Sequence, residues 1–229
     1  MRLLDVGCGP GTLTADLADL VAPGPVVGLD RSVEVLTEAK ITAEGRDNLS
    51  IMAGDVYRLG FLDGAFDVVH AHQVLQHLSD PVAALEEMGR VCAPDGFVAV
   101  RDADYHAMTW WPADPVLDRW MEVYQATARA NRAEPDAGRR LLSWAQAAGL
   151  TDIRPSASVW TFATAEDRRW WGDLWAERML RSELARQAIE GGHADQDELG
   201  EISEGWRRWA AAEDGWFVVV HGEVLARPH

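Results

Sequence analysis

The sequence predicts an α/β protein with a doubly wound, mostly parallel sheet of seven strands, helices on both faces and a helical insertion in its C-terminal half. Apolar runs alternate with helix-period segments over residues 1–104, which is the pattern of a parallel sheet covered on both faces. Two further strand candidates, at 152–162 and 215–227, have alternating or continuous apolar patterns. They suit an edge hairpin interrupted by a helical insertion.

Five strands are expected in the first 104 residues, at 2–7, 26–30, 49–55, 66–72 and 97–103. Between the first two, Leu13 and Leu17 fall at helical spacing, and the Pro-Gly-Pro turn at 23–25 ends that helix. A later helix has Pro81 in its first turn and runs to about Cys92. Ligands of such a sheet bind at the C-terminal ends of its strands.

The second half of the chain differs in composition, because all eleven tryptophans lie at or after position 110. Helices are expected near 115–131, 137–148, 165–189 and 196–211. We expect 1–104 to form a ligand-binding core and 105–229 to complete the same domain. The segments 105–131 and 164–213 are expected to form a helical lid, or alternatively to cover the sheet edge or form a dimer interface.

Composition limits the partners and the setting. The net charge of −16 argues against nucleic acid, since phosphate binding relies on clustered Lys and Arg. No apolar run reaches the roughly 20 residues that span a bilayer, and no signal peptide is evident, so we expect a cytoplasmic protein without a membrane partner. Cys8 and Cys92 are the only cysteines and are expected to be reduced, with no metal site. A homodimer is possible.

The loop Asp5-Val-Gly-Cys-Gly-Pro-Gly11 carries the functional argument. Gly7, Gly9 and Gly11 lie between a strand and a helix, where glycine allows a sharp turn and close approach of a ligand. The dinucleotide fingerprint needs its third glycine one position later, where this sequence has Thr12. The spacing therefore argues against NAD.

Acidic residues end the next two strands. Asp30 closes the second, where a carboxylate can accept both ribose hydroxyls, and Asp55 closes the third, where it can accept the adenine amine. Together these residues outline an adenosine site.

The first 105 residues resemble the class I S-adenosylmethionine-dependent methyltransferases, which have a Rossmann-like fold, and are similar to the quinone-biosynthesis type. The motifs are DVGCGPG, GLD, AGDVYRLGFLDGAFDVVHAHQVLQHLSDP and EEMGRVCAPDGFVAV, in family order. The later LLSWAQAAGLTDI resembles the segment before the family's sixth strand. Family members usually carry a helix before the first strand, whereas this strand begins almost at Met1.

The resemblance implies which residues bind S-adenosylmethionine. Its methionine part would contact the glycine loop. Its ribose would contact Asp30, which lies beside Arg31, and its adenine would contact Asp55 and Val56. The methyl-donor end would lie by the residues after the fourth strand. The full set is Gly7, Cys8, Gly9, Gly11, Asp30, Arg31, Asp55, Val56, Ala71, His72 and Gln73.

Methyl transfer from a sulfonium to oxygen, carbon or nitrogen needs alignment of the acceptor, and a base where the acceptor must lose a proton. His72 and His106 are the candidate bases. His70 is expected to point away from His72 on the strand, and His77 lies on the apolar side of VLQHL, so both are expected to be structural.

The segment after the fifth strand supplies candidate residues for the acceptor, which is expected to be a small apolar or aromatic molecule. They are Asp104, Tyr105, His106 and Trp110. Two alternatives stay open. A non-catalytic S-adenosylmethionine-binding protein would keep the nucleotide site alone, and an NAD-dependent oxidoreductase would share the fold and Asp30 but not explain Asp55.

Overall fold

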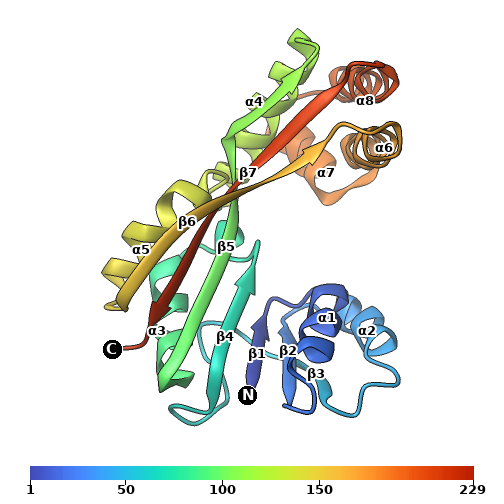
Figure 1. The fold of residues 1–229 in the computed structure, drawn as a ribbon. Helices are drawn as coiled ribbons and strands as arrows, with labels where there is room; N and C mark the ends of the chain where they lie inside the picture. The colour runs from blue at the N-terminus through green and yellow to red at the C-terminus, as the bar shows by residue number, and fades with distance from the viewer. The chain divides into compact units, whose positions relative to one another are not determined.

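The computed structural model describes residues 1–229 and contains one seven-stranded sheet with the order β3-β2-β1-β4-β5-β7-β6 (Figure 1). The strands are β1 (Leu3–Val6), β2 (Val26–Asp30), β3 (Leu49–Ala53), β4 (Phe66–His72), β5 (Cys92–Trp111), β6 (Thr151–Phe162) and β7 (Trp216–Arg227). The first five strands pair in parallel, for example Leu3 with Val26 and Val69 with Val98. One antiparallel hairpin completes the predicted doubly wound α/β sheet.

Eight α-helices and two short 3₁₀ turns connect the strands. The helices are α1 (Thr12–Val21), α2 (Val33–Thr42), α3 (Pro81–Val91), α4 (Pro115–Ala130), α5 (Leu141–Ala147), α6 (Ala165–Arg181), α7 (Glu183–Glu190) and α8 (Gln196–Ala211). The turns are η1 (Leu75–His77) and η2 (Ala137–Arg140). Side-chain caps set several starts. Asp80 accepts the Ala83 N–H before α3, and Ser32 accepts the Val35 N–H before α2.

The chain forms two compact units. The first consists of Met1–Asp102, Ala137–Ala157 and Gly222–His229, and the second of Ala103–Asp136 and Ser158–His221. The first unit therefore contains β1 to β4 and the beginning of β5, together with α1, α2, α3 and α5.

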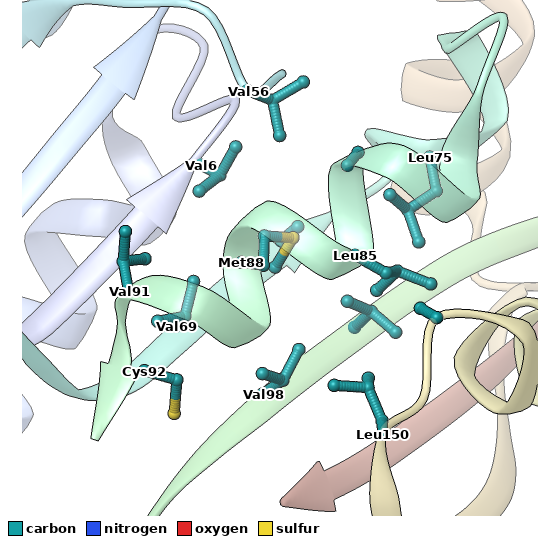
Figure 2. Close-up of a cluster of buried hydrophobic side chains, with 14 of the residues drawn as sticks. Val6, Val56, Val69, Leu75, Leu85, Met88, Val91, Cys92, Val98 and Leu150 are labelled. Carbon is teal, nitrogen blue, oxygen red and sulfur yellow. The ribbon is translucent and has the colours of Figure 1, made fainter. Parts of the chain in front are cut away.

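Side-chain alternation gives the sheet of the first unit two apolar faces. Leu3 and Val26 pack with Ala15 and Ala18 of α1, while Leu4 and its neighbours face the other side. On that second face, Leu85 and Met88 of α3 are fully buried against strand residues such as Val69 and Val98 (Figure 2). Helices thus cover both faces, as the apolar runs predicted.

The core of the second unit is aromatic. Trp120, Trp175, Trp206 and Phe217 are fully buried. The Trp120 ring lies 4.7 Å from Trp175 and 4.8 Å from Trp206, both edge to face. Such pairs contribute about 0.5–1.5 kcal/mol each beyond the area they bury. Five tryptophans are therefore packing residues of this unit: Trp120, Trp171, Trp175, Trp206 and Trp209. Four others are exposed: Trp111, Trp160, Trp170 and Trp216.

Three predicted elements were wrong in their bounds. The helix expected at 165–189 is two helices, because Ser182 adopts an extended conformation and caps α7 by accepting the Ala185 N–H. The fifth strand continues to Trp111, so the first part of the supposed helical lid 105–131 is extended. The segment 137–148 opens with the 3₁₀ turn η2 before α5.

None of the helices combines the length and apolar character needed to cross a bilayer.

Candidate functional site

The glycine loop turns the chain from β1 into α1 through three residues in the left-handed region. Gly7, Gly9 and Gly11 have φ values of 69°, 54° and 82°. A Cβ on Gly7 would lie 2.4 Å from Cγ2 of Val74, whereas a Cβ on Gly9 would meet nothing within 4 Å. Hydrogen bonds to β2 also fix the loop, because the Gly7 and Cys8 amides both donate to the Leu29 carbonyl, at 2.7 and 3.0 Å.

Asp30 ends β2 beside this loop. Its Oδ2 accepts the Gly9 N–H at 3.1 Å, and its Oδ1 accepts the Ser32 N–H at 2.9 Å. Each carboxylate oxygen has a further lone pair. Asp30 therefore orders the loop and keeps acceptor capacity for a ligand.

A cavity of about 280 Å³ opens at the C-terminal ends of β1, β2 and β3. Asp55, on its wall, accepts the Tyr57 N–H at 3.0 Å. The lining combines acidic, backbone and apolar groups: Val6, Gly7, Leu29, Asp30, Arg31, Gly54, Asp55, Val56, Tyr57, Gln73, Val74, His77 and Leu78. Carboxylates suit ribose hydroxyls and an exocyclic amine, and the apolar walls suit an aromatic base. The chemistry of the cavity fits a nucleoside.

The cavity brings together Gly7, Asp30, Arg31, Asp55, Val56 and Gln73 from the sequence-predicted set. Cys8, Gly9, Gly11, Ala71 and His72 do not line it. Ala71 is fully buried in the core on the α3 face. Cys8 is also buried, and desolvation raises the pKa of its thiol to about 12, so it stays protonated.

Several lining residues were missed by the sequence reasoning, among them Tyr57, Val74, His77 and Leu78. The signal available for the last three was their position directly after the fourth strand. His77 was expected to be structural because it lies in an apolar segment. In the structure it belongs to the turn η1, lines the cavity, and has its Nε2 3.1 Å from Nε2 of Gln76.

The expectation that His70 points away from His72 is wrong. Residues two apart on a strand share a face, and the two imidazoles are stacked with centroids 6.4 Å apart. His70 Nδ1 lies 2.7 Å from Asp5 Oδ1, and the Thr14 hydroxyl donates to Asp5 Oδ2 at 2.5 Å. Asp5 thus joins β1, α1 and β4 beneath the glycine loop.

His72 is a weak base in this environment. Burial, the neighbouring Arg101 guanidinium and His70 lower its pKa to about 4. The Arg101 Nη1 atom lies 3.5 Å from its Nε2. His72 is therefore neutral near pH 7 and holds a proton poorly.

The predicted acceptor residues belong to the second unit. Tyr105 is buried, stacks on Tyr124 at 3.9 Å and has a raised pKa, mainly through desolvation. Trp110 stacks on Phe217 at 5.6 Å. The His106 side chain is exposed, and its backbone N–H donates to Asp136. Asp104 is buried and accepts the Ala107 N–H at 3.2 Å.

No cluster of three or more His, Cys, Asp or Glu side chains is arranged to hold a metal ion. The two cysteines are buried free thiols.

A family model for a methyltransferase domain matches residues 1–158. The chain belongs to this methyltransferase family. The match covers the glycine loop, all residues that line the cavity, and η1.

Relatives of this methyltransferase extend over most of its length. An uncharacterized methyltransferase of Schizosaccharomyces pombe is 37% identical over 235 residues, which cover 98% of this chain and 83% of the relative. A demethylmenaquinone methyltransferase of Beutenbergia cavernae is 36% identical over 137 residues, covering 59% of this chain and 54% of that protein. The predicted resemblance to the quinone-biosynthesis type is confirmed.

Among solved structures, the fold is similar to phosphoethanolamine N-methyltransferase 2 of Haemonchus contortus, in complex with phosphomonomethylethanolamine and S-adenosylhomocysteine. The TM-score is 0.60 at 18% identity, and the match covers 100% of this chain and 49% of that one. This likeness supports the fold of the methyltransferase.

Proposed function

We propose that this methyltransferase binds S-adenosylmethionine in the cavity beside the glycine loop and transfers its methyl group to an oxygen, carbon or nitrogen of a small apolar or aromatic molecule. The observation that carries the proposal is the joint position of Gly7, Asp30 and Asp55 around one cavity at the strand ends. An oxidoreductase would not explain the third of these residues.

Different residues of the cavity bind different parts of the cofactor. Asp30 accepts ribose hydroxyls, with Arg31 beside it, and Asp55 accepts the adenine amine next to Val56. The methionine part lies against the loop that contains Gly7, Cys8, Gly9 and Gly11, near the start of α1, where the free amides of a helix N-terminus favour a carboxylate. Ala71 and His72, the last two residues of β4, and Gln73 directly after them then mark the methyl-donor end.

S-adenosylmethionine supplies an electrophilic methyl carbon, so the protein mainly has to align the acceptor and exclude water. No covalent enzyme nucleophile is needed, which agrees with the buried, protonated Cys8. Where the acceptor must lose a proton, His106 is the stronger candidate base, since His72 has a pKa of about 4.

We propose that the second unit determines the acceptor. Residues 1–104 then form the cofactor-binding core, and 105–229 complete the domain with 105–131 and 164–213 as the lid expected from the sequence. Asp104, Tyr105, His106 and Trp110 are the proposed acceptor residues. The support is chain continuity, because β5 runs without a break from the cofactor unit into this aromatic unit.

The proposed setting is the cytoplasm, with a small-molecule acceptor and no nucleic-acid or membrane partner. The net charge of −16 supports the first exclusion. We also propose that the protein forms a homodimer, which light scattering tests directly.

Thermal unfolding with ligands tests the function. S-adenosylhomocysteine should raise the melting temperature, because a ligand that binds only the native state stabilises it by mass action, and NAD should not. A larger shift with NAD would overturn the proposal. Turnover of labelled S-adenosylmethionine with a panel of hydroxyl, amine and carbon-acid acceptors then separates an enzyme from a non-catalytic binding protein.

A further inference from the structure

A buried acid lies directly behind one wall of the proposed cofactor cavity. Asp102 is the last residue of β5 within the first unit and is fully buried. Its Oδ1 accepts the Gln76 N–H at 3.0 Å, and the amides of Leu75 and Val74 also donate to the carboxyl group. The acid therefore holds the turn after β4 by its backbone.

The same turn forms part of the cavity. Val74 and His77 both line it, and the Val74 side chain closes the space above Gly7. One layer of backbone, the Val74–Gln76 amides, thus separates the Asp102 carboxyl from the cavity wall. No charged side chain is hydrogen-bonded to Asp102, and its Oδ2 atom is buried without a partner, as is Oε1 of Gln76.

The two forms of the cofactor differ in charge at one atom. The methyl donor carries a positive sulfonium, whereas the product S-adenosylhomocysteine has a neutral thioether at that position. We infer that Asp102 is the charge by which this site prefers the cationic methyl donor to the neutral product. The inference rests on the proposed function, because it needs the sulfonium in this cavity.

The charge on Asp102 changes near neutral pH. Burial raises the pKa of its carboxyl to about 7. The hydrogen bonds from the amides of the turn and the charge of Arg101 act in the opposite direction and lower it. Neighbouring elements carry further titratable or charged groups: His77 on η1, Arg139 and Arg140 on η2, which packs against η1, and His72 and Glu223, which both contact Arg101. Raising the pH through 7 thus places a negative charge behind the wall of the cavity.

The experiment measures the dissociation constants of S-adenosylmethionine and S-adenosylhomocysteine between about pH 6 and about pH 8. The expected result is that the preference for S-adenosylmethionine rises roughly tenfold with pH, as for opposite charges about 10 Å apart at an effective dielectric constant of about 20. Asp102→Asn should flatten this dependence. If the substitution only disturbed packing, it would weaken the binding of both ligands equally and leave the ratio of their dissociation constants unchanged.

A matched control addresses the histidine in the wall. His77 lines the cavity as well, so His77→Gln should keep the pH dependence if Asp102 is its source. Persistence of the dependence in Asp102→Asn, or its loss in His77→Gln, overturns the inference. Titration of the ligands themselves is common to all three proteins and cancels in the comparison.

A second measurement needs no variant to fold. If the sulfonium favours the ionised carboxyl, binding of S-adenosylmethionine to the unaltered protein near pH 7 must release protons. Binding of S-adenosylhomocysteine should then release fewer protons. Calorimetry in two buffers of different ionisation enthalpy measures this. Equal proton release with the two ligands overturns the inference while leaving the proposed function intact. Binding of neither ligand overturns both.

Discussion

The carboxylate of Asp30 accepts the backbone N–H of Gly9 at 3.1 Å, so the acid that ends β2 orders the loop that follows β1. Its other oxygen accepts the Ser32 N–H, which opens α2. One side chain therefore holds two loops at the cavity and lines the cavity as well. This double role makes Asp30 the residue whose substitution is most informative.

Replacement of Asp30 by alanine should weaken S-adenosylhomocysteine binding by about 1.5–3 kcal/mol, because charged acceptors contribute on this scale. Isothermal titration measures the dissociation constant, and circular dichroism checks the fold. Asp19→Ala is the control, since Asp19 is an exposed carboxylate that pairs with Arg46 instead. An unchanged dissociation constant in folded Asp30→Ala would show that the residue serves the loops alone.

Alanine at Gly7 should cost more than alanine at Gly9. Both positions have positive φ, so each substitution carries backbone strain of about 1 kcal/mol. Only at Gly7 does the added methyl also collide with Val74, at 2.4 Å, and thereby displace the cavity wall. The free energy of unfolding, measured with urea, and the affinity for S-adenosylhomocysteine should both fall further in Gly7→Ala than in Gly9→Ala. Equal losses in the two variants would mean that the Val74 contact relaxes freely.

His72 should make the protein less stable in acid. Its folded pKa of about 4 lies below the ordinary value of 6.5, so the folded state resists protonation. Stability from the neutral form is complete above pH 6.5 and is lost as the pH falls from there towards 4. His72→Gln should remove this loss, whereas substitution of the exposed His106 should not. Urea unfolding at several pH values tests it, and parallel curves for wild type and His72→Gln would contradict the prediction.

The two neighbours Tyr105 and His106 should separate packing from acceptor binding. Tyr105→Ala removes a buried ring that stacks on Tyr124, which should destabilise the protein by about 3–5 kcal/mol. His106→Ala lies at an exposed position and should change stability by no more than about 0.5 kcal/mol. If His106 serves the acceptor, its variant should lose turnover while keeping its affinity for S-adenosylhomocysteine. Full turnover would remove His106 from the acceptor residues.

The strands and the glycine loop were predictable because their signals are local. A buried parallel strand must be apolar, and a turn with positive φ at alternate residues favours glycine, so the stretch from Leu3 to Gly11 predicts its own structure. The acids Asp30 and Asp55 were placed by the same reasoning, since parallel strands end at one edge of the sheet. Each of these two carboxylates lines the cavity.

The sequence by itself determined the fold class, the methyltransferase family and the strand ends around the cofactor cavity, because these depend on local pattern and motif order. Tertiary structure alone decided that His77 lines the cavity, that Tyr105 is buried against Tyr124, and that Asp102 lies behind the turn Val74–Gln76. These relations join residues from different elements, and desolvation depends on everything packed around a group. The pKa of a carboxyl such as Asp102 therefore follows only from the packed chain.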